Sequence, residues 1–370
     1  MPLLRSTKHL TLLAADVLPP AGFALPANTT VLDALLRRSR LVVSPPQGLE
    51  EAVLHAFGLD PAANIVAPLT KLAELDTAGD TPVGTRSEQA WLRADPVHLA
   101  ISRDNAQLFD SHVVNPTAEE MAAIAQTINQ HFEPDGIVIT FPDPARGYIA
   151  TDANNLPQST PLWKMGGANV FDNLPLSKTR TNWRALSNEI QMLLHEHPVN
   201  ARRAEAAKPA INALWIWGGG ALSQALSASD AALAPPVFTN VVARLVLARG
   251  LGMAHQLPVV TLPPALDVAA LGERTLVVLH AATREVRAQS REAWPSAVAA
   301  IESDWIAPAI AAFDAGQLER LTIRLPGESA SLMLEVYREG VIAKFMSLVR
   351  PKKRLADHAG ACSEPESGAS

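Results

Sequence analysis

Residues 188–220 read NEIQMLLHEHPVNARRAEAAKPAINALWIWGGG, a run that places a helix, a polar turn, an apolar segment and three glycines in succession. Apolar residues recur every three to four positions from Trp183 to Leu194, which predicts an amphipathic helix. Pro198 ends this helix, because the residue before a proline is driven out of the α region. We therefore expect His197 at the helix C-terminus, where the macrodipole favours a cation.

The apolar run at residues 211–217 predicts a buried strand, and Gly218, Gly219 and Gly220 follow it directly. Glycine permits backbone conformations and close approaches that side chains block. A strand, glycines and then an Ala- and Leu-rich segment are typical of the crevice of an open α/β sheet, where ligands tend to bind. The glycines match neither GxGxxG nor GxxxxGK[ST], so the local sequence favours a tight connection over a phosphate cradle.

His195 and His197 are the two imidazoles of this stretch. No third His, Cys or carboxylate stands near them at the spacing of metal ligands. The sequence on its own therefore favours a helix-end cation and a hydrogen-bonded side chain over a metal site.

The composition is that of a globular chain without a strong charge bias. Its 370 residues are 48% hydrophobic, which allows one large α/β domain with an insertion, or two domains. The 31 basic and 37 acidic residues are spread along the chain, so nucleic acid is disfavoured as a partner. Apolar stretches end well short of about 18 residues and no signal-peptide pattern opens the chain, so we expect no membrane segment and a cytoplasmic location. The single cysteine, Cys362, excludes an internal disulfide.

Periodicity and turn signals predict further elements along the chain. Strands are predicted at residues 9–15, 136–141, 147–151, 275–280, 321–325 and 331–337, and helices at residues 30–40, 49–57, 241–251 and 297–315. Residues 97–101 and 106–109 flank a turn at residues 103–105 and predict a hairpin. Thr117 and Glu120 form a capping box for a helix that runs to about Phe132.

The order of these elements predicts an insertion. Residues 92–152 read β-β-α-β-β, a compact antiparallel unit unlike the parallel sheet expected around it. We therefore expect residues 89–152 to form an inserted subdomain, and residues 1–88 and 153–350 to form a discontinuous core. The polar, small-residue composition of residues 351–370 predicts a disordered tail.

Three blocks carry a family resemblance: WLRADPVHL at residues 91–99, NEIQMLLHEHPVN at residues 188–200 and LWIWGGG at residues 214–220. They resemble proteobacterial regulatory proteins of the RpfE type. More distantly, the HPVN turn with its apolar strand, and the FGLDP run at residues 57–61, resemble archaeal-type, cofactor-independent phosphoglycerate mutases. This resemblance implies an alkaline-phosphatase-like fold, with a mostly parallel sheet flanked by helices and an inserted antiparallel α+β subdomain.

The same resemblance implies a two-metal phosphoryl-transfer site, of which this sequence keeps little. Asp16 matches the metal-binding aspartate that follows the first strand, and is expected as a remnant at most. Leu49 stands where the resemblance places the nucleophile, and leucine has no nucleophilic atom. The Asp and His ligands expected after the strand at residues 275–280 are replaced by AATREVRAQ, with His280 alone at the strand end. We therefore expect no catalytic residues and no cofactor.

Several residues are expected to bind a ligand. The resemblance places His98 on a strand that meets substrate, and Arg146 and Tyr148 at a turn that faces the phosphate ester, where arginine would supply charge-assisted hydrogen bonds. For Arg146, a solvated turn is an equally good interpretation. The remaining candidates belong to the opening stretch: His195, His197, Asn200, Arg203, Gly218, Gly219 and Gly220.

Three functions remain open. The first is a catalytically degenerate relative of phosphoglycerate mutase that regulates, or binds a small phosphate- or carboxylate-bearing ligand. The second is an active mutase or phosphatase that uses Mn²⁺, Co²⁺ or Zn²⁺ with ligands such as His98, His195 or His197. The third is a protein–protein adaptor whose tryptophans line a partner surface: Trp91, Trp163, Trp215, Trp217 and Trp305. The sequence favours core positions for these tryptophans.

Overall fold

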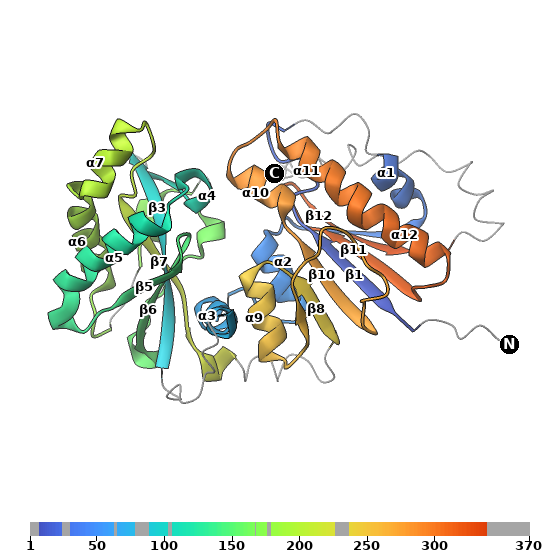
Figure 1. The fold of residues 1–370 in the computed structure, drawn as a ribbon, viewed down its shortest axis with the longest axis horizontal. Helices are drawn as coiled ribbons and strands as arrows, with labels where there is room; N and C mark the ends of the chain where they lie inside the picture. The colour runs from blue at the N-terminus through green and yellow to red at the C-terminus, as the bar shows by residue number, and fades with distance from the viewer. Residues whose placement is uncertain are drawn as a thin grey trace, which may run out of the picture. The chain divides into compact units, whose positions relative to one another are not determined.

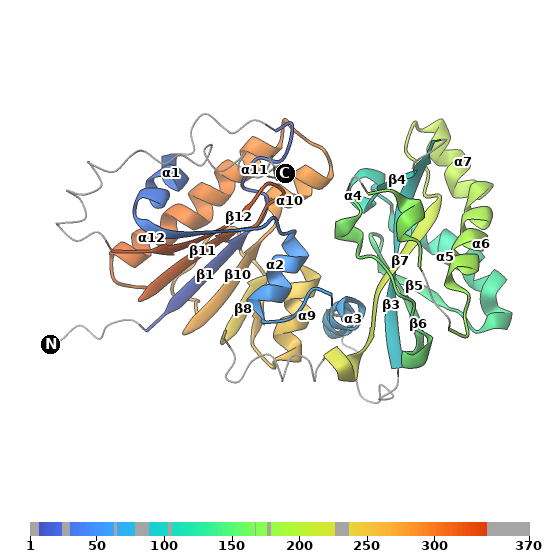
Figure 2. The ribbon, with the colours of Figure 1, turned by 180° about the vertical axis from the view of Figure 1, so that it is seen from behind.

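A computed structural model describes residues 7–23, 30–62, 65–77, 89–102, 106–166, 168–175, 179–225 and 237–338. The chain divides into two units, shown from opposite sides in Figure 1 and Figure 2. Unit 1 is discontinuous and comprises Met1–Leu59 and Leu233–Ser370, whereas unit 2 is the continuous segment Asp60–Ala232. The predicted tail at residues 351–370 and the predicted turn at residues 103–105 lie outside the described residues.

Unit 1 contains a seven-stranded sheet in the order β2-β12-β11-β1-β10-β8-β9. Its strands are β1 (His9–Ala14), β2 (Ser39–Ser44), β8 (Asn240–Ala243), β9 (Val259–Val260), β10 (Arg274–Leu279), β11 (Arg320–Leu325) and β12 (Ser331–Val336). Five neighbouring strands are parallel: β11, β1, β10, β8 and β9. At one edge β12 pairs antiparallel with β11, and β2 pairs antiparallel with β12. The predicted strands at residues 9–15, 275–280, 321–325 and 331–337 are confirmed, as is a largely parallel sheet flanked by helices.

The helices of unit 1 lie on both sides of this sheet (Figure 1). They are α1 (Thr30–Arg37), α2 (Leu49–Ala56), α9 (Val246–Ala254), α10 (Ala281–Arg287), α11 (Trp294–Ile301), the π-helical turn η5 (Glu302–Ile306) and α12 (Ala307–Asp314). Apolar side chains of α1, α11 and α12 pack on one face of β1, β10, β11 and β12 and form the core. The Glu302 carboxylate of η5 accepts a hydrogen bond from the Leu32 N–H (3.1 Å) and so ties α1 to the long helix.

The segment Trp294–Asp314 is, within the described ranges, the one helix long and apolar enough to cross a membrane. Its residues Trp294, Val298, Ile306 and Ala309 are fully buried in the core of unit 1. The length and apolar character of this helix are therefore accounted for by its position against the sheet.

Two predictions within unit 1 are wrong in detail. The helix predicted at residues 30–40 ends at Arg37, and the chain continues directly into β2, because Val42 and Val43 suit the strand that pairs with β12. The helix predicted at residues 241–251 begins only at Val246. The preceding Asn240–Ala243 forms β8, inserted between β10 and β9. In both places β-branched residues satisfy a strand as readily as one face of a helix.

Unit 2 contains a separate antiparallel sheet built on the long strand β3. Its strands are β3 (Gln89–Ile101), β4 (Ala106–Phe109), β5 (Ile139–Asp143), β6 (Arg146–Asp152) and β7 (Ala213–Ala221). β3 pairs with β4, β6 and β7, all antiparallel, and β5 pairs with β6. The predicted hairpin and the two strands after residue 136 are confirmed.

The helices of unit 2 cover this sheet. They are α3 (Val66–Thr77), α4 (Ser111–Val114), α5 (Ala118–Phe132), α6 (Trp183–His195) and α7 (Pro198–Glu205), with short 3₁₀ turns η1 (Glu133–Asp135), η2 (Ala153–Asn155), η3 (Leu162–Lys164) and η4 (Val170–Asn173). The capping box predicted for Thr117 and Glu120 begins α5. Apolar residues of α5 and α6 pack with Leu92, Ala94 and Ile216 of β3 and β7 to form a second core.

The opening stretch folds differently from its prediction. β7 is an antiparallel partner of β3, so residues 211–221 do not lie in the parallel sheet. Gly218, Gly219 and Gly220 lie inside β7 rather than in a turn after it. A Cβ at Gly219 would lie 2.5 Å from Leu92 Cδ2, and Gly218 has a φ of 65°. The glycines therefore permit close packing and a local backbone bend within a strand.

The inserted unit is also larger than predicted. Residues 153–232 belong to unit 2 together with residues 89–152, and so does the α3 segment that precedes them. The physical reason is that β7 completes the sheet of β3, while α3 and α6 pack on β3 and β7. Strand pairing across more than 100 residues of sequence leaves no local signal from which the boundary could be predicted.

Candidate functional site

The carboxyl edge of the parallel sheet in unit 1 gathers several chain segments. β11, β1 and β10 are neighbouring parallel strands, so the loops that follow them leave at the same edge. Asp16 follows β1 in a left-handed conformation (φ 56°), and its N–H donates to Pro326 O after β11 (2.8 Å). Gln47 N donates to Gly327 O (3.3 Å), which brings the start of α2 to the same place.

The Asp16 side chain is the buried carboxyl group of this edge, with 8% of the residue exposed. Burial raises the pKa of Asp16 to about 6, opposed by the Thr283 hydroxyl and the Arg287 guanidinium, while Glu328 and Glu50 raise it further. The Thr283 hydroxyl is buried and meets this carboxyl only beyond the geometry of a regular hydrogen bond. Asp16 therefore lies among two other carboxylates and one arginine.

α2 and α10 supply the ion pair of this edge. Arg287 Nη2 lies 2.5 Å from Glu50 Oε2. Glu50 follows Leu49, the first residue of α2, whose side chain is buried with 2% exposed. Sequence reasoning missed Arg287; the available signal was that Thr283 and Arg287 are four residues apart after a buried strand and so share a helix face.

The metal centre implied by the resemblance does not fit these residues. Over the part of the chain that the structure describes, no group of three His, Cys, Asp or Glu is arranged to hold a metal ion. Asp16 has a guanidinium rather than an imidazole among its charged neighbours. A two-metal site needs several carboxylates and imidazoles converging within a few ångströms, so Asp16 alone does not constitute one.

A second polar cluster lies inside unit 2, around Asp95 of β3. The Asp95 carboxylate accepts hydrogen bonds from Arg93 Nε (3.0 Å) and Nη2 (2.7 Å), from Trp217 Nε1 (2.8 Å) and from Gly147 N (3.3 Å). Burial raises the pKa of Asp95, and the guanidinium, indole and amide donors oppose this shift. All four contacts are hydrogen-bond donors, an arrangement that favours the ionised carboxylate and so opposes the effect of burial.

Aromatic rings and cations alternate across this face of the sheet. Lys71 Nζ of α3 lies 5.0 Å from the Trp91 ring centroid and 5.1 Å from that of Tyr148. Arg93 Cζ lies 5.4 Å from the Tyr148 ring and 5.3 Å from the Trp217 ring. Each cation therefore lies between two rings, an arrangement that stabilises a buried positive charge and fastens α3 to the sheet.

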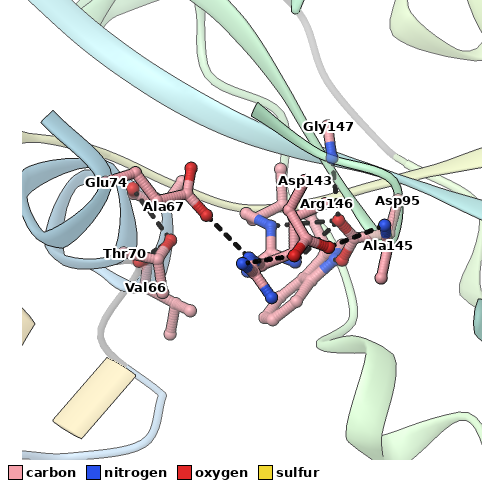
Figure 3. Close-up of polar contacts among 11 residues, drawn as sticks. Val66, Ala67, Thr70, Glu74, Asp95, Asp143, Ala145, Arg146 and Gly147 are labelled. Carbon is pink, nitrogen blue, oxygen red and sulfur yellow. Dashed lines mark hydrogen bonds and ion pairs between the residues drawn. The ribbon is translucent and has the colours of Figure 1, made fainter. Parts of the chain in front are cut away.

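Arg146 and Tyr148 are both predicted to bind ligand, and both border this cluster. Arg146 lies beside it in Figure 3, and the Tyr148 ring lies 5.4 Å from Arg93 Cζ. Arg146 Nε lies 2.6 Å from Glu74 Oε1 of α3, and Arg146 Nη2 lies 3.0 Å from Asp143 Oδ2. Tyr148 is fully buried, burial raises its pKa, and its hydroxyl meets the Thr70 hydroxyl without regular hydrogen-bond geometry. The Arg146 guanidinium thus already faces two carboxylates, and an anionic ligand would compete with them.

His197 has a different role from the one predicted. It caps the N-terminus of α7 instead of ending α6: its Nδ1 accepts from Val199 N (3.2 Å). Its Nε2 lies 2.9 Å from Thr127 Oγ1, and burial lowers the His197 pKa. This hydrogen-bond pattern fits the neutral tautomer protonated at Nε2, so the predicted helix-end cation is wrong. The reason is that Pro198 is the first residue of α7, a position that proline favours, so a second helix follows α6 almost at once.

Asn200 and Arg203 of α7 are engaged within the protein. Asn200 Nδ2 donates to Leu194 O and Ile211 O (2.8 Å each), and Asn200 Oδ1 accepts from Ile211 N (2.8 Å). Arg203 is 1% exposed; its Nη1 pairs with Glu120 (2.7 Å), Nε donates to Pro209 O (2.7 Å) and Nη2 donates to Val114 O. These bonds join α6, α7, the start of α5 and the entry to β7.

The other two predicted imidazoles lie apart. His195 is exposed in the last turn of α6. His98 is half-buried on β3, where its Nδ1 lies 2.9 Å from Ala210 O and its ring lies 6.2 Å from Phe109. Neither belongs to a group of metal-ligand side chains among the residues described. The structure therefore brings together Arg146 and Tyr148, and separately His197, Asn200 and Arg203, but not the histidines as one set.

Comparisons with known proteins give a distant resemblance. No model of a known protein family matches the chain. The 2,3-bisphosphoglycerate-independent phosphoglycerate mutase of Methanosarcina mazei is 23% identical over 206 residues, and the probable enzyme of Geobacter sulfurreducens is 26% identical over 202 residues. Each alignment covers 52% of this chain and 49% of the relative, so the match spans about half the length of these proteins.

Among solved structures, the cofactor-independent phosphoglycerate mutase of Thermoplasma acidophilum superposes with a TM-score of 0.40 at 14% identity, covering 90% of both chains. A protein from Pyrococcus horikoshii superposes with a TM-score of 0.44 at 16% identity, covering 90% of this chain and 88% of that one. The sequence matches show that the chain is distantly similar to 2,3-bisphosphoglycerate-independent phosphoglycerate mutases.

Proposed function

We propose that this protein is a catalytically degenerate relative of the phosphoglycerate mutases with a regulatory or ligand-binding role. The observation that carries the proposal is Leu49. It stands where the resemblance places the nucleophile, it begins α2, and its side chain is buried. A phosphoenzyme at this position would need an oxygen, sulfur or nitrogen nucleophile, and leucine offers none.

The surroundings of Leu49 support the same proposal. The next residue, Glu50, pairs with Arg287, and Arg287 also acts on Asp16. In a metal-dependent phosphoryl transfer, the cations clamp the attacking and leaving oxygens. In this protein the positive charge near Asp16 is the Arg287 guanidinium, which forms an ion pair with the Glu50 carboxylate.

Turnover measurements test the proposal directly. The purified full-length protein would be incubated with 3-phosphoglycerate, and separately with a generic phosphate ester, in Mn²⁺, Co²⁺ or Zn²⁺. We expect neither isomerisation nor phosphate release above the buffer rate. Turnover that disappears in the Asp16→Ala variant would refute the proposal, because it would show a working centre that depends on Asp16.

The proposed ligand is a small phosphate- or carboxylate-bearing molecule, and Arg146 is its best-placed partner in unit 2. Its guanidinium is one quarter exposed and lies between Glu74 and Asp143. An anion would bind by displacing one of these carboxylates. Calorimetric titration with 3-phosphoglycerate should therefore show binding that the Arg146→Ala variant loses, and equal affinity in the variant would remove Arg146 from the proposal.

An active metal-dependent mutase or phosphatase is the second candidate. It is favoured by the names of the sequence relatives, which are phosphoglycerate mutases at 23–26% identity. Stoichiometric divalent metal in the untagged protein, measured by elemental analysis, would favour it over the first proposal.

Three of the five tryptophans in the adaptor prediction are buried and cannot line a partner surface. Trp215, Trp217 and Trp305 are at most 5% exposed, so a partner could reach only Trp91 and Trp163 of the five tryptophans in that prediction. A regulatory role of the RpfE type, a cytoplasmic location and the absence of a nucleic-acid partner stay predictions from the sequence.

A further inference from the structure

The carboxyl edge of unit 1 brings a buried carboxyl group, Asp16, together with the half-buried Glu50 and the exposed Glu328. Asp16, Glu50 and Glu328 come from the loop after β1, the first turn of α2 and the loop after β11. Two backbone hydrogen bonds hold these segments together, Asp16 N to Pro326 O (2.8 Å) and Gln47 N to Gly327 O (3.3 Å). The charges of Glu50 and Glu328 both act on Asp16 and disfavour its ionised form, and a cation among these carboxylates offsets that repulsion.

Arg287 is the cation that the structure places there. Its Nη2 lies 2.5 Å from Glu50 Oε2, and its charge stabilises the ionised form of Asp16. The arginine side chain is 25% exposed and that of Glu50 is 12% exposed, so the ion pair is mostly covered by the protein. Arg287 is one helical turn after Thr283, so both side chains point from α10 toward Asp16.

Thr283 supplies the second observation. Its hydroxyl is buried, with 3% of the residue exposed, and no regular hydrogen bond satisfies it although it faces Asp16. An orphaned hydroxyl beside a buried carboxyl group marks a place where oxygen ligands are present but not saturated. The Thr283 hydroxyl and the Asp16 carboxylate are oxygen atoms that could ligate a metal ion, but among the described residues no group of three His, Cys, Asp or Glu is arranged to hold one.

We propose that the Arg287 guanidinium is a built-in substitute for a divalent cation: it pairs with Glu50, offsets part of the negative charge of Asp16 and Glu328, and excludes a metal ion from the carboxyl edge of the sheet. A guanidinium bonded to Glu50 places a positive charge within range of Asp16, and a divalent ion near the same carboxylates would be repelled by it.

The test is a gain of metal binding. Full-length wild type, Arg287→Ala and Arg287→Gln would be titrated with Mn²⁺ by calorimetry, and thermal unfolding would be followed with and without Mn²⁺. Both neutral variants should bind Mn²⁺ about tenfold more tightly than wild type, because one repelling charge near the ion is removed. Mn²⁺ should also raise their Tm, and adding Asp16→Asn should abolish the gain.

Two matched controls separate position from overall charge. Arg287→Lys keeps a cation at the position and should gain no Mn²⁺ binding. Arg284→Ala removes a cation from the same helix, where the side chain is 69% exposed and pairs with Glu285, and should also leave Mn²⁺ binding at the wild-type level. If Arg287→Ala is poorly folded, Arg287→Gln retains a donor to Glu50 and carries the comparison.

Three outcomes would overturn this inference: wild type that binds Mn²⁺ as tightly as the neutral variants, folded neutral variants that gain no Mn²⁺ affinity, or an equal gain in Arg284→Ala. The inference concerns the same edge as the proposed function but is measured by binding alone. A wild-type protein that turns over substrate but binds Mn²⁺ more weakly than the neutral variants would refute only the proposed function. An inactive wild-type protein that binds Mn²⁺ as tightly as the neutral variants would refute only this inference.

Discussion

At the scale of single residues, Asp16 is a buried carboxyl group in unit 1 whose pKa is raised. It is 8% exposed, its backbone is left-handed (φ 56°), and Trp294 Nε1 donates to its carbonyl (2.8 Å). Burial raises the pKa of its side chain to about 6 from an ordinary value of 3.8. The folded protein therefore holds this proton more tightly than the unfolded chain does.

This shift predicts how stability depends on pH. Because the folded pKa lies above the unfolded one, the free energy of unfolding falls as pH rises from about 4 to about 6, and stays reduced above that. Asp16→Asn removes the titration, and asparagine tolerates the left-handed backbone. The variant should match wild type near pH 4 and be more stable at pH 8, by up to about 3 kcal/mol. Urea unfolding at both pH values measures this.

Asp267→Asn is the matched control, since Asp267 is exposed in the same unit and asparagine can still accept from Ala269 N. It should leave the pH dependence unchanged. A stability difference between Asp16→Asn and wild type that is independent of pH would contradict the buried, proton-holding state of Asp16.

Asn200 has a structural role that the sequence alone does not indicate. Its amide makes three hydrogen bonds of 2.8 Å, to Leu194 and Ile211, and links α6 to the entry of β7. Asn200→Ala leaves these buried backbone groups unpaired and should destabilise unit 2 by about 2–4 kcal/mol. Chemical denaturation measures the loss. Asn182→Ala removes only an exposed cap of α6 and should cost about 1 kcal/mol; equal losses would contradict the account.

At the scale of elements, the close contact of β3 and β6 depends on Gly147. A Cβ at this position would lie 2.1 Å from Ala94 O and 2.6 Å from the Phe141 ring. Because the first of these atoms is backbone and cannot rotate away, Gly147→Ala should cost about 3 kcal/mol or more. It should also disturb Asp95, which accepts from Gly147 N. Thermal unfolding with Gly166→Ala as control tests this, since a Cβ at Gly166 meets nothing within 4 Å.

The elements also show how far the sequence predicts this fold. The capping box of α5 and the strands β1, β10, β11 and β12 were predictable, because caps and apolar runs are local signals. β7 was predicted as a strand but assigned to the wrong sheet. All nine residues of β7 are buried, so its sequence is a continuous apolar run. Such a run is typical of a parallel strand, which is why the sequence led to the wrong sheet.

The candidate site was less predictable than the fold. Asp16 and Leu49 could be placed by resemblance, whereas Arg287 could not, because its importance arises from a contact with Glu50 across 237 residues. Likewise, Arg146 was recognised as a charged turn residue, but its two carboxylate partners include Glu74 on a helix 72 residues away. Pairings of this kind depend on tertiary structure and leave no spacing in the sequence.

At the scale of the whole molecule, the continuous segment Asp60–Ala232 has its own sheet and its own apolar core. Residues 60–232 produced alone should therefore unfold cooperatively, with native-like near-ultraviolet circular dichroism from the buried Trp183, Trp215 and Trp217. Unit 1 consists of two segments, so residues 1–59 alone should not fold. A non-cooperative transition for residues 60–232 would contradict the division into two units.

The central proposal is that this chain forms no phosphoenzyme, because the resemblance places the nucleophile at Leu49, the first residue of α2. The most direct measurement is intact-mass spectrometry of the full-length protein after incubation with 3-phosphoglycerate and Mn²⁺ and an acid quench. Without a phosphoenzyme the mass stays unchanged. A mass increase of one phosphoryl group, mapped to any side chain and lost in Asp16→Ala, would contradict it.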